Sequence, residues 1–263
     1  HSGEHRSPRF AAWAQRLWRR PLAYGAVAVA LLLALAIPVL SLDTGMPSIK
    51  VVPKGDSSRQ GYEQVQAAFG DGAPGALQLV TTQKQAPQVA ALAERDPGIA
   101  RVMPAQPGSG GSAVVQAIPR QDPSNKAVGA TVERLRAEAP QGTLVGGAVA
   151  ENHDLEELLA AKTPLVIGVV LALGFLLLLV ALQAPIIAAV GVVTNLLATG
   201  AAFGVAQLIF QEGHLSSLLG FEPQGFLDAW GPVLSFAMIF AISMDYTVFL
   251  LSSATEHWDR PHD

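Results

Sequence analysis

Three long stretches of the chain are apolar and carry almost no charge. Residues 21–42 and 163–211 contain no Asp, Glu, Lys, Arg or His, and residues 229–255 contain a single one, Asp245. A helix needs about 20 apolar residues to cross the hydrocarbon core of a bilayer, so these stretches predict membrane spans. The second stretch is long enough for two crossings. Gln183-Ala184-Pro185 divides it, because proline disfavours helix at the residue before it.

The basic residues near the N-terminus predict the orientation of the spans. The segment before the first span contains one acidic residue, Glu4, and five arginines: Arg6, Arg9, Arg16, Arg19 and Arg20. The positive-inside rule then places this end in the cytoplasm. The following apolar run exceeds the roughly 7–15 residues of a signal-peptide core, which favours an anchoring span. The predicted order is a cytoplasmic basic segment (1–21), a span (22–42), an extracytoplasmic domain (43–162), two spans (163–183 and 185–210), an extracytoplasmic interfacial loop (211–230), a fourth span (231–253) and a cytoplasmic tail (254–263).

The extracytoplasmic residues 43–162 have the patterning of a folded domain. Changes of hydrophobic period and turn residues predict helices at 56–69, 86–96, 122–138 and 152–162, and strands at 76–82, 99–103, 113–119 and 143–145. We expect Ser57 or Ser58 to cap the first helix, and the last helix to continue into the second span. From Ala76 onward the order is β-α-β-β-α-β, which is the split βαβ, ferredoxin-like arrangement. The predicted fold is an α-helical membrane bundle with an α+β domain outside it.

Asp245 is the residue with the clearest chemical meaning. It is followed by Tyr246 and lies near the middle of an apolar run, where an ionised carboxylate costs at least about 2.5–3.5 kcal/mol. Protonation relieves that cost, as does a hydrated or cation-bearing interior. A carboxyl group that passes between those states can carry a proton. The alternative is a structural acid, hydrogen-bonded to a neighbouring helix.

The third predicted span carries polar and small residues at helical spacing. Asn195 and Thr199 are its candidate hydrogen-bonding groups, and Gly200 and Gly204 form a small-xxx-small pair that permits close helix approach. Ser243, two residues before Asp245, belongs to the same candidate set. The pattern favours helix packing for these residues, with a role for Asn195 in a proton relay as the alternative.

Composition excludes several classes of protein. Hydrophobic residues make up 50% of the chain and charged residues 14%, with a net charge of -4, so no nucleic-acid partner is expected. The absence of cysteine excludes disulfides and thiolate metal sites. Gly108-Ser109-Gly110-Gly111-Ser112 matches neither a phosphate loop nor a nucleophile elbow, and His153 has no second histidine at metal-ligand spacing. We therefore expect no enzyme, no cofactor and no metal site.

At this point the residues resemble a known family, the MMPL (mycobacterial membrane protein large) transporters of the RND superfamily. The segment from Phe236 to Ser252 looks like the family's tenth helix, whose Asp-Tyr pair lies on the proton pathway, and 195–204 is similar to its ninth. Segments 69–77 and 145–147 resemble its second porter domain. The resemblance covers nearly all of residues 10–260. It implies that the chain is a fragment, with spans seven to ten of twelve and the second porter domain.

The resemblance implies proton-driven export of lipids or hydrophobic metabolites across the cell membrane, with Asp245 and Tyr246 coupling proton flow to transport. Membrane lipids, a lipidic substrate and the remaining half of the transporter would be its partners, and assembly into a homo-oligomer stays open. The alternative is a secretion accessory or lipid-sensing membrane protein of the same architecture. A second half that repeats span, domain and Asp-Tyr helix would favour the exporter.

Overall fold

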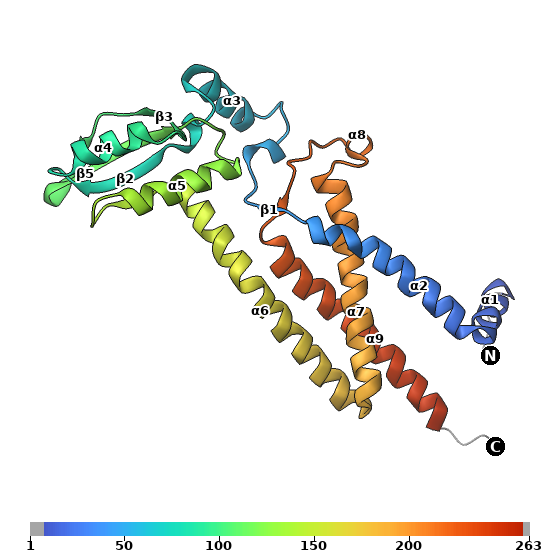
Figure 1. Ribbon diagram of the computed structural model, residues 1–263. Coiled ribbons are helices and arrows are strands. Elements are labelled where there is room, and N and C mark those ends of the chain that lie inside the picture. The colour runs from blue at the N-terminus through green and yellow to red at the C-terminus, as the bar shows by residue number, and fades with distance from the viewer. Residues whose placement is uncertain (1–7, 260–263) are drawn as a thin grey trace. The chain divides into compact units, whose positions relative to one another are not determined.

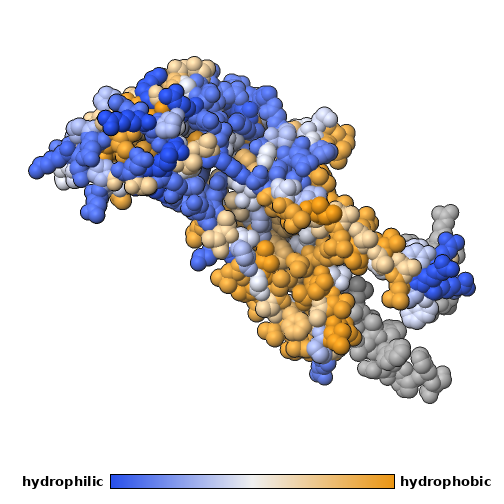
Figure 2. All heavy atoms as spheres, in the orientation of Figure 1, coloured by the Kyte–Doolittle hydropathy of each residue, from blue (hydrophilic) through white to orange (hydrophobic). Residues whose placement is uncertain are grey.

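The computed structural model describes residues 8–259, which form two compact units (Figure 1). One unit is helical and comprises residues up to 42, 169–214 and 236 onward. The other contains the β-sheet and comprises residues 43–168 and 215–235. Hydrophobic residues cover most of the face of the helical unit that Figure 2 shows, whereas the same view of the sheet unit is mostly hydrophilic. The surface of the helical unit therefore suits lipid, and the surface of the sheet unit suits water.

The helical unit contains the apolar segments. Its elements are α1 (Pro8–Arg19), α2 (Pro21–Ala36), a 3₁₀ turn (Ile37–Ser41), the second half of α6 (Ala148–Leu182), α7 (Pro185–Ala206), a π turn (Gln207–Gln211) and α9 (Phe236–Asp259). Pro21–Ser41, Ala148–Leu182 and Pro185–Gln211 are long and apolar enough to cross a membrane. Within the described residues, the apolar segment Gly231–Tyr246 is shorter than these three. The structure thus supports three of the four predicted spans by length and composition.

The break between α6 and α7 lies at the predicted position. Gln183 has a left-handed backbone with φ 51°, and Ala184 is extended before Pro185 at the first position of α7. Proline is tolerated there because the first N–H groups of a helix have no intrahelical partner.

The sheet unit follows the predicted order of elements, except that the short strand β4 lies in a segment that was not predicted to form a strand. It contains β2 (Leu77–Thr82), α4 (Ala86–Arg95), β3 (Ile99–Val102), β4 (Gln106–Pro107), β5 (Ser112–Pro119), α5 (Lys126–Glu138) and β6 (Leu144–Gly146). The strand order is β3-β5-β2-β6, and β4 pairs with β5. All these pairings are antiparallel. The two central strands β2 and β5 are therefore neighbours in space although α4 and β3 separate them in sequence.

Alternation along β2 and β5 builds the core of this unit. Leu77 and Leu79 of β2 and Val115 of β5 are fully buried, while the intervening residues are more exposed. Side chains alternate between the two faces of a strand, so this pattern turns one face toward the helices. Buried residues of α4 and α5 complete the core, namely Val89, Ala93, Val128, Val132 and Leu135.

One predicted N-cap residue and two predicted helix starts are wrong. The α3 helix (Ser57–Phe69) has Asp56 at the N-cap position, not Ser57 or Ser58. The predicted helix from Asp122 begins at Lys126, since the Asp122 carboxylate accepts hydrogen bonds from Ser124 in a turn. The α6 helix begins at Ala148, before the predicted residue 152.

A short strand pair was not predicted. Thr44–Gly45 (β1) pairs in parallel with Leu227–Asp228 (β7), which joins residues at opposite ends of the sequence. A Cβ atom on Gly45 would lie 2.8 Å from the ring of Phe226, so glycine is required for this approach. The segment 215–235, which also contains α8 (Ser216–Leu219), thereby belongs to the sheet unit.

Asp96 makes the stability of the sheet unit sensitive to acid. Its carboxylate accepts hydrogen bonds from Arg134 Nε and Nη2, both at 2.8 Å, and from the Gly98 N–H at 2.7 Å. The bonds from Arg134 hold the pKa of Asp96 below its usual value of 3.8, despite burial of the carboxyl group. The stabilisation is present above that value and is lost as the pH falls through the lowered pKa.

We expect Arg134→Gln to destabilise the sheet unit by about 1–3 kcal/mol at pH 7, because a largely buried carboxylate loses its charged partner. The difference from wild type should shrink toward zero in acid, where Asp96 is protonated. Hydrogen exchange of the β2 and β5 amides, compared with wild type at each pH, measures it. Arg101→Gln removes an exposed arginine on β3 and is the control. A difference that persists unchanged in acid would contradict the role of Asp96.

Candidate functional site

Asp245 lies on α9 beside an open apolar groove in the helical unit. The groove has a volume of about 710 Å³, and it is lined by Leu173, Leu176, Leu177, Val180, Ala181, Asp245, Val248 and Phe249. Asp245 is the single charged residue in this lining. The groove therefore combines an apolar lining with one ionisable group.

The neighbouring face of α9 packs closely against the same helix, α6. Phe240 and Met244 are buried, and a Cβ atom on Gly174 of α6 would lie 2.5 Å from the Met244 Cε atom. The rings of Phe236 and Phe240 stack with centroids 5.6 Å apart. These contacts bury Phe240 and Met244, whereas Asp245 and Tyr246, the next two residues of α9, are exposed. Neither side chain forms a hydrogen bond or ion pair with another residue that the structure describes.

Asn195 connects α7 to the helix that carries Asp245. Its side chain is 3% exposed, and Nδ2 donates a hydrogen bond of 3.2 Å to the Phe240 carbonyl oxygen. Thr199 Oγ1 donates to the Asn195 carbonyl oxygen at 2.9 Å. Asn195 Oδ1 has no hydrogen-bond partner among the described residues. The structure therefore brings Asn195 to the backbone of α9 at Phe240, and not to the Asp245 carboxyl group.

The two candidate glycines of α7 differ sharply in their surroundings. A Cβ atom on Gly204 would lie 1.8 Å from the Leu35 carbonyl oxygen, whereas one on Gly200 would lie 3.6 Å from Ala36 Cβ. Close backbone approach at Gly204 thus holds α7 against the end of α2. Ser243 is half-buried on α9, next to the buried Met244.

Gln207 is a buried polar residue that sequence reasoning left outside the candidate set. It is 1% exposed, and Nε2 contacts Glu212 Oε1 at 3.0 Å and Ser41 Oγ at 3.4 Å. Gln211 Nε2 donates to the Ser41 carbonyl oxygen at 3.0 Å. Amides in the π turn therefore bind the end of the first apolar segment. A glutamine inside an apolar run was the available signal.

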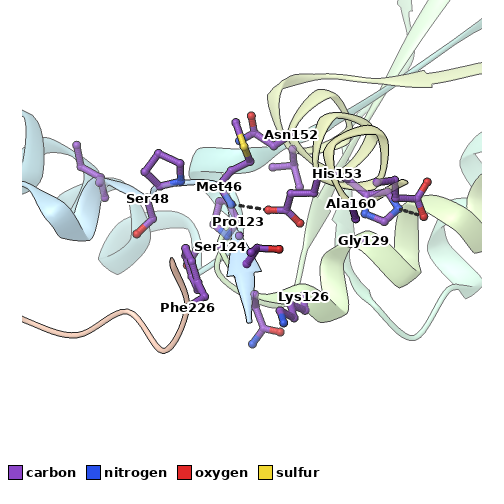
Figure 3. A pocket seen from close by; sticks show the side chains of 18 of the residues that line it. Met46, Ser48, Pro123, Ser124, Lys126, Gly129, Asn152, His153, Ala160 and Phe226 are labelled. Atoms are coloured by element: carbon purple, nitrogen blue, oxygen red, sulfur yellow. Dashed lines mark hydrogen bonds and ion pairs between the residues drawn. The ribbon is translucent and has the colours of Figure 1, made fainter. Parts of the chain in front are cut away.

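The sheet unit contains a cavity of about 410 Å³ (Figure 3). Its lining combines Met46 and Phe226 with polar residues of α6, and the Met46 N–H donates to the Glu156 carboxylate. His153 Nε2 lies 3.2 Å from Glu133 and 3.6 Å from Glu157. The ligand atoms of this histidine and two glutamates lie within 4.8 Å of one another. Glu133 was not predicted to lie near His153, because it is 20 residues away in the sequence. The ion pairs of His153 with Glu133 and Glu157 are sufficient to explain why these three side chains lie together.

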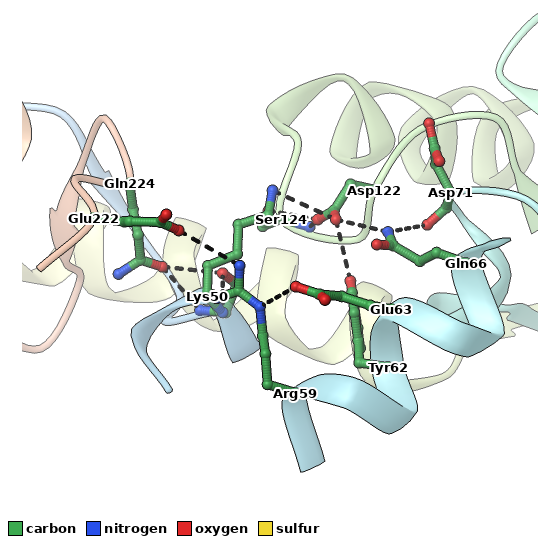
Figure 4. Close-up of polar contacts among 11 residues, drawn as sticks. Lys50, Arg59, Tyr62, Glu63, Gln66, Asp71, Asp122, Ser124, Glu222 and Gln224 are labelled. Carbon is green, nitrogen blue, oxygen red and sulfur yellow. Dashed lines mark hydrogen bonds and ion pairs between the residues drawn. The ribbon is translucent and has the colours of Figure 1, made fainter. Parts of the chain in front are cut away.

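A polar network joins distant segments of the same unit (Figure 4). Arg59 of α3 is buried, and it contacts Glu63 at 2.6 Å and Glu222 at 3.5 Å. Lys54 contacts Glu222 at 2.6 Å, and the Ser48 hydroxyl group donates to Gln224 at 3.1 Å. These contacts fasten the segment 222–224 to the residues that follow the first span.

Asp122 is the centre of a second part of this network. Burial alone would raise the pKa of Asp122, but hydrogen bonds from Ser124 and Gln66, together with the Lys50 charge, hold it below its usual value. Its carboxylate also accepts the Tyr62 hydroxyl hydrogen bond at 3.3 Å, and burial and this anion raise the pKa of Tyr62. Asp122 is therefore an ionised structural acid at neutral pH.

The model of the MMPL family matches residues 79–263, which include every candidate residue of α7 and α9. The chain belongs to the MMPL family. Membrane protein YdfJ of Bacillus subtilis is 25% identical over 99% of this chain and 38% of its own length. The mycolic acid-containing lipids exporter MmpL11 of Mycolicibacterium smegmatis is 30% identical over 94% of this chain and 28% of its length. The trehalose monomycolate exporter MmpL3 of Mycobacterium tuberculosis is 28% identical over 93% and 28%.

The match confirms the MMPL resemblance inferred from the Asp-Tyr helix. MMPL proteins are multi-pass proteins of the cell membrane, and they are transporters, not enzymes. The apolar helices of this chain agree with that location. The chain spans well under half the length of these MMPL relatives.

Proposed function

We propose that this chain is part of a transporter that uses the proton-motive force to export lipids or hydrophobic metabolites across the cell membrane. Family membership supports transport, and two relatives are named as exporters of mycolic acid-containing lipids and of trehalose monomycolate. The observation that carries the proposal is Asp245, a single carboxyl group exposed to an apolar groove on an otherwise uncharged part of its helix.

The proposed arrangement has four spans (22–42, 163–183, 185–210 and 231–253), with residues 1–21 and 254–263 in the cytoplasm. The domain 43–162 is then an extracytoplasmic porter domain with a ferredoxin-like split βαβ fold, and the strand order β3-β5-β2-β6 supports that assignment. The loop 211–230 lies on the same side, and its strand β7 pairs with β1.

Asp245 and Tyr246 are the proposed proton-coupling residues. Asp245 takes up a proton from the outside and becomes neutral, which removes the cost of an ionised carboxylate within the bilayer. Loss of the proton to the inside restores the charge, and with it the preference for a hydrated or cation-bearing surface. The neutral form of Asp245 favours an apolar environment, and the charged form favours a hydrated or cation-bearing one. Protonation and deprotonation therefore shift α9 between two positions. Asn195 positions that helix through the Phe240 carbonyl oxygen, and Thr199 binds the Asn195 backbone. Gly200 and Gly204 serve helix packing between α7 and the end of α2, and Ser243 lies on α9 itself.

The proposed partners are membrane lipids, a lipidic substrate and the rest of the same transporter. The groove beside Asp245 is a surface that the remaining half could cover, since the chain spans less than two fifths of the MMPL relatives' lengths. A second copy of the same transporter is a further candidate partner, and no nucleic-acid partner is proposed.

Transport by the full-length protein in proteoliposomes tests this function. With a fluorescent acyl lipid as probe, we expect export while a proton gradient is imposed, and a fall to the protein-free rate when a protonophore collapses it. Liposomes without protein control for spontaneous lipid transfer. Export that continues unchanged without the gradient would contradict proton coupling. An absence of export in both conditions would favour an accessory or lipid-sensing role.

A further inference from the structure

The helix α1 has two chemically different faces. At 100° per residue, Trp13, Leu17 and Trp18 fall on one half of the helix, while Arg16 and Arg19 fall on the other. Trp13 is 59% exposed and Trp18 is 85% exposed. Neither belongs to the hydrophobic core of the sheet unit, which consists of aliphatic side chains. Exposed tryptophans beside arginines are typical of a helix that lies in a membrane interface.

The backbone separates α1 from the first span. Arg20 has φ −143° and ψ 59°, which is not helical, and Pro21 begins α2. Figure 1 shows the chain changing direction between the two helices. The amphipathic helix therefore ends at the point where the uncharged apolar segment Pro21–Ser41 begins. This junction places α1 beside the lipid headgroups once α2 spans the bilayer.

The charge of α1 is one-sided. Its last turn contains Arg16 and Arg19, no acidic residue lies in its first turn, and Arg20 follows directly. Arg16 and Arg19 are both exposed, and no described residue forms a salt bridge with either of them. Guanidinium groups bind phosphate through paired N–H donors, and a basic segment next to a span attracts anionic lipid.

We propose that α1 lies flat in the membrane interface and binds anionic phospholipid headgroups. Trp13, Leu17 and Trp18 enter the boundary between headgroups and acyl chains, and Arg16 and Arg19 bind lipid phosphates. The basic flank predicts that this is the cytoplasmic leaflet. The site is separate from Asp245, and its lipid selectivity does not depend on export.

Quenching of Trp13 and Trp18 by brominated lipids tests the site. The full-length protein is reconstituted in phosphatidylcholine containing increasing amounts of phosphatidylglycerol, with bromine on the acyl chains of one lipid at a time. The same measurement on W13F/W18F gives the fluorescence of all other tryptophans, and this signal is subtracted from that of the wild type. We expect brominated phosphatidylglycerol to quench at a lower mole fraction than brominated phosphatidylcholine, and the difference to vanish in about 1 M salt.

In R16Q/R19Q, the mole fraction of brominated phosphatidylglycerol for half-maximal quenching should rise on the order of 25-fold, because each arginine near an anionic surface contributes about a fivefold factor and the two factors multiply. K84Q/R101Q removes two exposed charges of the sheet unit and should leave the midpoint unchanged. Equal quenching by both lipids in the wild type would overturn the selectivity. Failure of both lipids to quench Trp13 and Trp18 would show that protein covers this face. Loss of export with intact quenching would reject the proposed function alone.

Discussion

Replacement of Asp245 by asparagine in the full-length transporter should reduce proton-driven export to the background rate and leave membrane insertion unchanged. Asparagine has nearly the same shape as aspartate, but it cannot take up and release a proton at physiological pH. The carboxyl group lies at the exposed edge of α9, beside an apolar groove, so its removal disturbs no described contact in the helical unit. A loss of export would therefore come from lost chemistry and not from lost packing.

Two further variants make the result specific. Tyr246→Phe removes a hydroxyl group and keeps the ring, so we expect a smaller reduction in export. Asp71→Asn makes the same change at an exposed carboxyl group of the sheet unit and should export at the wild-type rate. Export is measured in proteoliposomes under an imposed proton gradient, with equal amounts of inserted protein. Near-normal export by Asp245→Asn would reject the proposed mechanism.

Replacement of Gly204 by alanine should have the largest effect on the stability of the helical unit. The added Cβ atom would lie 1.8 Å from the backbone oxygen of Leu35, and a backbone group cannot turn away as the end of a side chain can. The α2 and α7 helices would have to separate. Forced separation in a packed region typically costs about 1–3 kcal/mol, and occasionally more.

Gly200→Ala is the matched control for this substitution. It adds the same atom one helical turn earlier, where the nearest heavy atom is Ala36 Cβ at 3.6 Å, an ordinary contact. Alanine is favoured over glycine in helices by roughly 1 kcal/mol, so this variant should be as stable as wild type or slightly more stable. Unfolding of purified protein in mixed micelles measures both. Equal stability of the two variants would contradict close packing at Gly204.

The sequence was sufficient to predict which residues belong to the candidate site, but not how they are arranged in space. Asp245 is conspicuous in the sequence because it interrupts an apolar run, and Asn195 because amides are rare in such runs. Their spatial relation was not apparent. Asn195 binds the backbone of α9 at Phe240, and the Asp245 face lies along α6 instead. Helical phase places residues on one helix, but the partner helix and its rotation depend on packing.

The helix starts show the same limit on a smaller scale. Several polar residues before a helix can act as the N-cap, and the choice depends on which side chain is already engaged elsewhere. Asp122 binds Ser124, so Asn125 caps α5 and accepts a hydrogen bond from the Ala127 N–H at 2.9 Å.

By itself, the sequence determined the apolar segments, the break at Pro185, the β-α-β-β-α-β order and the isolated carboxyl group of Asp245. Each of these follows from neighbouring residues, because hydropathy and periodicity are local properties. Tertiary structure alone decided the close approach of Gly204 to Leu35, the pairing of β1 with β7 and the burial of Arg59 beside Glu222. These contacts join residues far apart in the chain, and their free energy comes from complementary surfaces that no local pattern encodes.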